Sequence, residues 1–298
     1  MREPWDRCAR NGRDGRKQAR LAVVVAAQTR LGGSFLRNQR PRCDRRTLFQ
    51  RPVRNESLVI QDTLDHIAGF ADHIVVYDDA STDNTLDTVK RHDSVALVVE
   101  NKRWLPSIED RLRSETRHRG LLLAMANQYL NSSWMMCCDA DERYVGPIKE
   151  TLRSKTLTAG VDGFRIRLFD AYMTVDDHEP YKGDRPLFGF RKWFGPERRD
   201  ILMIWRNTND AIYTGLDSRE PSGVRSLATR FHCQHYGKSL SLEHWDETCK
   251  YYMTHFPAEP YGKKWEARLG KAIHEKSDFG RPLYPWGQPL FNHQTKEF

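Results

Sequence analysis

Apolar residues along the chain gather in short runs, separated by longer stretches in which apolar and polar residues mix. Runs rich in β-branched and aromatic residues are typical of buried strands, and the mixed stretches have the spacing of amphipathic helices. We predict strands over 47–51, 74–77, 95–99 and 134–138. We predict helices over 55–67, over 86–91 (capped by Ser81 or Thr82), and from Ser107 or Glu109 to Tyr129. This alternation predicts an α/β fold, a mostly parallel sheet with helices on both faces.

The pattern changes after residue 162. Residues 163–169 alternate between apolar and polar, as a half-exposed strand does, and 201–205 is a further strand. Residues 176–193 have the proline and glycine content of a loop, whereas 241–253 has the pattern of a helix. We expect one main domain over 46–255, with halves at 46–145 and 146–255. Residues 256–298 are expected to form a C-terminal tail that wraps around it.

The positive charge of the chain is concentrated at its start. The 298 residues have a formal net charge of +8, but residues 1–54 hold 15 Lys and Arg against 4 Asp and Glu, which leaves 33 and 36 for the remainder. The body is therefore slightly acidic. We expect 1–45 to be a basic, poorly ordered extension, either solvated or in peripheral contact with an anionic membrane. No nucleic acid is expected as a partner, because the body has no RNA-binding aromatic signature.

Composition and cysteine usage favour a cytoplasmic protein. Mean hydropathy is −0.73, and no apolar run approaches the roughly 20 residues of a membrane-spanning helix. The apolar run at 21–27 is short for a signal-peptide core. The six cysteines have no CxxC or zinc spacing, and Cys137 and Cys138 lie in a predicted strand, where cysteine acts as a small hydrophobe. Free thiols fit a reducing compartment.

Two of the predicted strands end in paired acids. The run at 134–138 leads into Asp139, Asp141 and Glu142, and the run at 74–77 leads into Asp78 and Asp79. Ligands of open α/β sheets bind at the carboxyl ends of strands, so the two acidic tips predict one shared site. Oxygen-rich clusters suit Mg²⁺ or Mn²⁺, which neutralise the phosphates of a nucleotide. The alternative is a solvated acidic turn.

Three segments carry a resemblance to a known family. They are 52–56 (Pro-Val-Arg-Asn-Glu), 76–85 (Val-Tyr-Asp-Asp-Ala-Ser-Thr-Asp-Asn-Thr) and 138–142 (Cys-Asp-Ala-Asp-Glu). In order and spacing they resemble the family 2 glycosyltransferases, above all the bacterial and viral members that decorate polysaccharide or lipopolysaccharide. The resemblance implies the GT-A fold, a Rossmann-like sheet with a smaller acceptor-side C-terminal portion. It is strongest over about 46–145.

The resemblance also implies roles for individual residues. The nucleotide base and ribose would be contacted by Asp78, Asp79, Pro52, Arg54 and Glu56. Asp139 and Asp141 would hold the ribose and a Mn²⁺ or Mg²⁺ ion on the diphosphate of a UDP-, dTDP- or GDP-sugar. A third metal ligand would come from the stretch around His232 and His235, of which His235 fits the motif better. Arg119 and Lys238 are expected to contact the diphosphate, and Arg117 is a weaker candidate.

The resemblance also bears on the general base. In lipopolysaccharide-type members a His-Glu pair lies ahead of the His-Tyr motif, and this chain has Arg219 and Glu220 there. Glu220 matches the glutamate, whereas Arg219 replaces the histidine. We expect Glu220 and Asp141 to be the catalytic residues, with Glu220 as base. Other candidates for the base are Asp176, Asp177 and Glu179.

The sequence therefore predicts a metal-dependent, hexosyltransferase-like glycosyltransferase. It would move a sugar from a nucleotide diphosphate sugar to a glycan or lipid-linked acceptor, with inversion, because no nucleophile constellation is present. A sugar-phosphate nucleotidyltransferase is the alternative enzyme, but that class needs a glycine-rich loop after the first strand and 52–56 has no glycine. Two further alternatives are a basic protein associated with nucleic acid and a transferase relative that binds without turnover.

Overall fold

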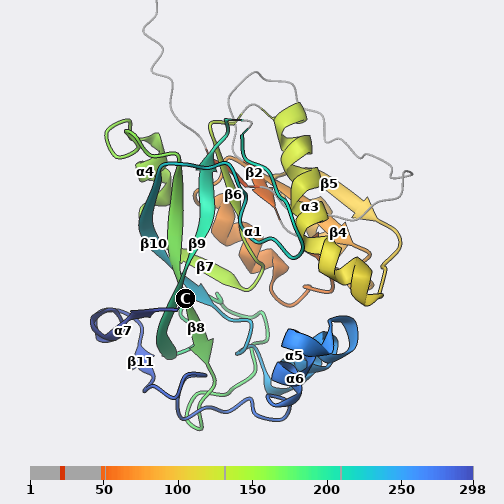
Figure 1. The fold of residues 1–298 in the computed structure, drawn as a ribbon, viewed down its shortest axis with the longest axis vertical. Helices are drawn as coiled ribbons and strands as arrows, with labels where there is room; N and C mark the ends of the chain where they lie inside the picture. The colour runs from red at the N-terminus through yellow and green to blue at the C-terminus, as the bar shows by residue number, and fades with distance from the viewer. Residues whose placement is uncertain (1–20, 24–47, 51, 131, 209, 298) are drawn as a thin grey trace, which may run out of the picture.

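The computed structural model describes residues 21–23, 48–50, 52–130, 132–208 and 210–297. The strands of these residues form one sheet in the order β3-β4-β1-β6-β9-β8-β10-β7, with β5 beside β4, β2 beside β6, and β11 and β12 beside β9 (Figure 1). The strands are β1 Leu21–Val23, β2 Leu48–Gln50, β3 Pro52–Val53, β4 His73–Asp79, β5 Val95–Asn101, β6 Trp134–Cys137, β7 Glu142–Val145, β8 Gly163–Tyr172, β9 Trp193–Arg206, β10 Leu227–His235, β11 Tyr284–Pro285 and β12 Thr295–Lys296. The helices are α1 Ile60–Ala68, α2 Thr85–Arg91, α3 Ile108–Tyr129, α4 Ile148–Arg153, α5 Leu242–His255, α6 Lys263–Glu266 and α7 Gln288–His293, with a π-helical turn η1 at Ala258–Gly262.

The first half of the sheet is parallel, as expected. Strand β4 pairs in parallel with β3 and β5, and β2 pairs in parallel with β6. Helix α3 lies over one face of this half and α1 over the other (Figure 1). The α/β fold with helices on both faces is therefore confirmed. Of the expected basic extension 1–45, only β1 is described; it pairs in parallel with β4 and β6.

Helix ends follow local chemistry where the sequence offers a clear cap. Helix α3 begins after Ser107, whose hydroxyl accepts a hydrogen bond from the Asp110 amide at 3.1 Å. Helix α1 begins at Ile60, later than expected, and buries Ile60, Leu64 and Ile67 at helical spacing. Contrary to expectation, neither Ser81 nor Thr82 caps helix α2. Its first amide, on Thr85, donates instead to the Asp83 carboxylate at 3.0 Å.

The second half of the sheet is mixed. Strand β6 is antiparallel to β9, β9 is antiparallel to β8, and β8 is parallel to β10. Strand β7 follows the β6 tip directly and lies antiparallel to β10, with His235 opposite Glu142. This pairing places the end of β10 beside the acidic tip of β6. Beyond residue 255, β11 and β12 pair with β9.

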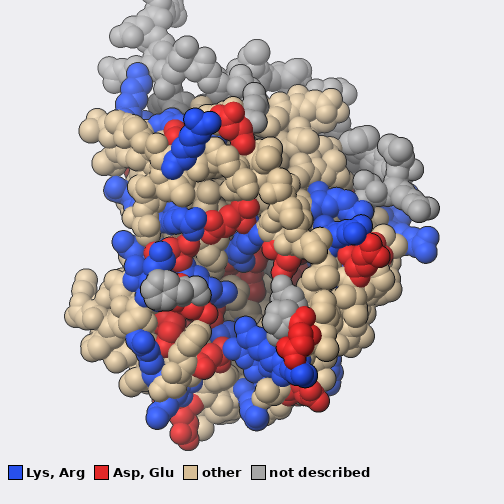
Figure 2. Space-filling model, in the orientation of Figure 1, with Lys and Arg blue, Asp and Glu red and all other residues tan. Residues whose placement is uncertain are grey.

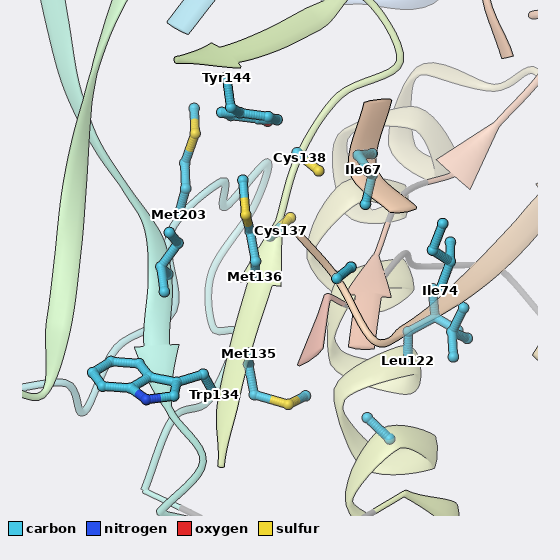
Figure 3. Close-up of a cluster of buried hydrophobic side chains, with 14 of the residues drawn as sticks. Ile67, Ile74, Leu122, Trp134, Met135, Met136, Cys137, Cys138, Tyr144 and Met203 are labelled. Carbon is cyan, nitrogen blue, oxygen red and sulfur yellow. The ribbon is translucent and has the colours of Figure 1, made fainter. Parts of the chain in front are cut away.

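Strand β6 runs through the centre of the hydrophobic core. Trp134, Met135 and Met136 are fully buried, with Leu122 of α3 and Ile74 of β4 on one side and Met203 of β9 on the other (Figure 3). A strand that is buried on both faces has no position exposed to solvent for a polar side chain, which explains the unbroken apolar run in the sequence. Because the strand is held in the core, the position of Asp139, the first carboxylate after it, is fixed as well.

Two further sequence expectations can be compared with the described residues. Cys137, Cys138, Cys233 and Cys249 are buried free thiols, as expected, while Cys8 and Cys43 lie outside the described residues. No helix in the described part of the chain combines the length and apolar character needed to cross a bilayer.

We predict that His66 makes the free energy of unfolding sensitive to acid. Its Nε2 accepts a hydrogen bond from the Tyr144 amide at 2.8 Å, and burial, followed by the charge of Arg143, lowers the pKa of His66 to about 4. The unfolded chain takes up this proton near pH 6.5, so stability is lost as pH falls from about 6.5 towards 4. We expect His66→Gln to lose less stability than the parent between pH 7 and 5 in urea unfolding. Exposed His178→Gln is the control, and equal losses in the two variants would contradict this.

Candidate functional site

Charged side chains gather across the middle of one face of the molecule, where the surface is hollowed (Figure 2). The carboxyl ends of parallel β4 and β6 both contribute acids to the site that the sequence predicts. The acids of β4 are Asp78 and Asp79, which are almost fully buried. Those that follow β6 are Asp139 and Asp141 in the turn and Glu142 at the start of β7, of which Glu142 is fully buried.

At the tip of β4, Asp79 is held by hydrogen bonds from two neighbouring elements. Its carboxylate accepts from Asn101 of β5 at 2.9 Å and from Arg111 of α3 at 3.0 Å. The Arg54 guanidinium donates to the Asp79 carbonyl at 3.2 Å and stacks 4.4 Å from the ring centre of Trp104. Asp78 accepts from the Ser81 amide, and burial raises the pKa of its carboxyl group. The tip is therefore rigid, with an arginine and an indole at its side.

The loop after β3 is joined to the loop after β4. Asn55 adopts a positive φ of 56° and its side chain accepts from the Thr82 amide at 2.8 Å. The Glu56 amide donates to the Thr85 hydroxyl at 2.8 Å, and Pro52 pairs with Tyr77 across the strands. Ser81 and Thr82 thus bind this loop and do not cap α2. Of the sequence-predicted residues, Arg54 contacts Asp79, Glu56 contacts Thr85, and Pro52 pairs with Tyr77; their roles toward a nucleotide remain predictions.

At the tip of β6, arginines surround the first acid. Arg219 Nη1 donates to Asp139 Oδ2 at 2.6 Å, and its Nη2 donates to Glu142 Oε1. Arg119 Nη2 lies 3.8 Å from Asp139 Oδ1 and 2.7 Å from Glu115. The other Glu142 oxygen accepts from the Asp139 amide at 2.7 Å and from the Tyr144 hydroxyl. Glu142 therefore fixes the shape of the turn and binds Arg219 at the same time.

Helix α3 connects the two acidic tips. Arg111 contacts Asp79 and Arg119 contacts Asp139, and the two arginines are eight positions apart on one helix face, with Glu115 between them. At 1.5 Å per residue they are separated by about 12 Å. A nucleoside diphosphate is long enough to span such a distance, so one ligand can contact both tips.

Asp141, the second acid of the turn, faces His235 at the end of β10. Asp141 Oδ2 lies 3.5 Å from His235 Nε2, and His235 Nδ1 lies 2.6 Å from Asp170. Burial alone would lower the pKa of His235, but the two carboxylates raise it to about 9. The imidazole is therefore held as a cation between two acids. Gly237 lies against this group: a Cβ there would come within 2.7 Å of Asp141 Oδ2.

Two predicted residues are engaged away from the acidic tips. Lys238, expected on the diphosphate, forms ion pairs with Asp170 at 2.7 Å and Asp278 of the C-terminal tail at 2.6 Å. Glu220, expected as the base, is paired with Arg165 through both oxygens at 2.7 Å, and one of them also accepts from the Leu202 amide at 3.1 Å. These contacts give Lys238 and Glu220 structural roles, and their predicted chemical roles remain predictions.

Comparison with known proteins identifies the segment that carries both tips. Residues 52–146 match the model of glycosyl transferase family 2, a range that includes 76–85 and 138–142. The match covers about a third of the chain, and over these residues the chain is similar to that family. The resemblance seen in the sequence is thereby confirmed for this part of the chain, which extends from β3 past β7.

Individual proteins are similar to different extents of the chain. Uncharacterized proteins of Mycobacterium bovis and Mycobacterium tuberculosis are each 35% identical over 96 residues, which is 32% of this chain and 23% of the relative. The chain thus matches about a quarter of the length of these curated relatives. Solved structures of S. aureus TarS 1–349 and of a mannosyltransferase from Pyrobaculum calidifontis are 16% and 18% identical, and each covers 73% of this chain. This chain covers 67% and 68% of theirs, with TM-scores of 0.34 and 0.36. Because both scores are below 0.5, no residue role is transferred from them.

The three expected metal ligands do not form a metal-binding group among the described residues. Among the described residues, no group of three or more His, Cys, Asp or Glu side chains is arranged to hold a metal ion. Asp141 and His235 are neighbours, but Asp139 Oδ2 is bound to Arg219 instead. The donor set of Asp139, Asp141 and His235 therefore does not fit a divalent cation in this arrangement, because an arginine already neutralises one of its members.

Sequence reasoning missed several residues that shape the candidate site. Arg111, Asn101 and Asp170 each bind an expected site residue through a contact between distant segments, for which the sequence has no signal. Arg219 did have a signal: it stands where the related members have a histidine. That substitution could have indicated that a cationic side chain enters the site.

Proposed function

We propose that this protein transfers a sugar from a nucleotide diphosphate sugar to a hydroxyl group of a glycan or lipid-linked acceptor. One observation carries the proposal: the acid-bearing tips of β4 and β6 are linked by a single face of α3, about two helical turns apart. The family 2 match over 52–146 supports the same assignment. The base and ribose would lie against Asp78, Asp79 and Arg54, and the diphosphate against the turn after β6.

The reaction is a single displacement. The acceptor oxygen attacks the anomeric carbon, the bond from that carbon to the diphosphate oxygen breaks, and the nucleoside diphosphate leaves with the electron pair. The acceptor proton passes to the Asp141 carboxylate. Attack from the face opposite the leaving group inverts the anomeric configuration. We assign the base to Asp141 and not to Glu220 because both Glu220 oxygens are engaged by Arg165.

The function is tested by nucleotide binding and turnover. We expect one of UDP, GDP or dTDP to raise the melting temperature, with CMP as the weaker comparison. The matching sugar nucleotide should then release its nucleoside diphosphate, measured by a coupled assay with glycan or lipid-linked acceptors. Absence of both stabilisation and release for every nucleotide, with and without Mn²⁺, would refute the proposed activity.

Gly237→Ala tests the space beside Asp141. The new Cβ would lie 2.7 Å from Asp141 Oδ2 and 3.0 Å from His235 Nε2, so one of these groups must move. We expect nucleoside diphosphate release to fall by about 10²-fold, while nucleotide stabilisation by the tip of β4 persists. Gly262→Ala is the matched control, because its nearest neighbour to a new Cβ is 3.6 Å away. Equal rates for the two variants would remove Asp141 and His235 from the reaction centre.

A further inference from the structure

The guanidinium group of Arg219 forms ion pairs with two of the acids that follow β6. Arg219 Nη1 lies 2.6 Å from Asp139 Oδ2 and Nη2 binds Glu142, so one guanidinium joins the first and last acids of the motif. The Glu142 side chain is fully buried, that of Asp139 is 14% exposed, and that of Arg219 is 27% exposed. The ion pair is thus at the inner wall of the site and still reachable from solvent.

The segment that carries Arg219 is anchored on both sides. The Asp217 amide donates to the Leu112 carbonyl at 3.0 Å, and the Ser218 amide donates to the Thr116 hydroxyl at 2.8 Å, which fastens the segment to α3. On the other side, Glu220 is fastened to β8 by its two bonds from Arg165 and to β9 by the Leu202 amide. These contacts hold Arg219 over the turn from two directions. They also explain the presence of a glutamate at 220 without a role as base.

A second arginine supports the first. Arg119 is 4% exposed, donates to the Ser218 carbonyl at 2.8 Å, and lies 3.8 Å from the other oxygen of Asp139. Its buried Nε–H has no hydrogen-bond acceptor among the described residues. A divalent ion bound to Asp139 would meet two guanidinium groups at short range, and like charges at such distances repel strongly.

We propose that Arg219, supported by Arg119, neutralises the departing diphosphate in place of a divalent metal ion, so that the reaction does not depend on one. An arginine has five N–H donors in a planar fork suited to phosphate. Two of these bind the acids, and the others can donate to diphosphate oxygens. As the bond between the anomeric carbon and the diphosphate oxygen breaks, the growing negative charge meets a fixed guanidinium. This inference rests on the proposed function and specifies how its leaving group is stabilised.

The test begins with the unmodified protein. We expect the melting-temperature shift produced by the preferred nucleoside diphosphate, and the release of that diphosphate from its sugar nucleotide, to be the same in EDTA as in Mn²⁺. If EDTA abolishes release and Mn²⁺ restores it, the inference is overturned while the transferase activity stands. If neither condition gives binding or release, the proposed function and the inference fail together.

Variants separate a chemical role from a structural one. Arg219→Gln should lower the rate of release by about 10²–10³-fold, the usual cost of removing one charge-stabilising donor. Arg219→Lys, which keeps the charge, should retain more activity than Arg219→Gln. Exposed Arg225→Gln in the same segment is the control and should behave as the parent. Equal rates for Arg219→Gln and Arg225→Gln would overturn the inference, and if Arg219→Gln does not fold, the chelator experiment alone decides.

Discussion

Replacing Asp141 by asparagine is expected to lower nucleoside diphosphate release from the sugar nucleotide by about 10²–10⁴-fold, the range for loss of a general base. Asparagine has nearly the same shape, and the backbone carbonyl of Asp141 still accepts from the Tyr236 amide at 2.8 Å. The fold should therefore persist. The amide cannot take the acceptor proton, and it leaves the His235 cation with one carboxylate instead of two.

Steady-state release of nucleoside diphosphate, with acceptor present, measures this effect. Asp184→Asn is the matched control, because Asp184 is an exposed loop acid outside the site. The nucleotide should still stabilise Asp141→Asn, since the tip of β4 is unchanged. Turnover of Asp141→Asn equal to that of Asp184→Asn would exclude Asp141 as the base and return Glu220 to consideration.

The second large effect is expected in stability. Arg111→Met would leave the Asp79 carboxylate buried without its cationic partner, because both side chains of this ion pair are at most 5% exposed. Removing one partner of a buried ion pair costs about 3–5 kcal/mol. We therefore expect the urea midpoint of Arg111→Met to fall strongly. Nucleotide binding should fall as well, because Asp79 loses the group that orients it.

A control variant and a double variant test whether loss of the ion pair between Arg111 and Asp79 causes the destabilisation. Arg113→Met removes an exposed arginine of the same helix, paired with Glu109, and should cost about 0–1 kcal/mol. Arg111→Met combined with Asp79→Asn removes the uncompensated charge, so the double variant should be more stable than Arg111→Met alone. A double variant less stable than Arg111→Met, or equal losses for the two arginine variants, would show that the ion pair is not what stabilises this region.

The parts of the fold that the sequence predicts well are those set by local pattern. Strand β6 is unbroken in its apolar residues because both faces are buried, and Asp139 and Asp141 follow just beyond its end. Helix α3 begins next to the expected start at Ser107, whose side chain accepts a hydrogen bond from an amide three positions on. The same reasoning failed for Ser81 and Thr82, because each bonds to Asn55, more than 25 residues away in the sequence.

The candidate site was predicted only in part, because only some of its features are local in the sequence. The acids at strand ends are visible as motifs, and the structure brings Asp78 and Asp79 beside Arg54, and Asp141 beside His235. The partners that decide what these acids do come from distant segments: Arg219 lies 80 residues from Asp139, and Glu220 lies 55 residues from Arg165. Pairings of this kind depend on tertiary structure. A sequence therefore shows that a charge is present without showing which opposite charge it meets.

A crystal structure of the protein with its preferred nucleoside diphosphate bound tests the central claim most directly. One ligand should lie along α3, with its base and ribose against Asp78, Asp79 and Arg54 and its diphosphate against Arg219 at the turn after β6. A ligand bound elsewhere, or one that touches the tip of β4 while its phosphates point away from Asp139 and Arg219, would contradict the account.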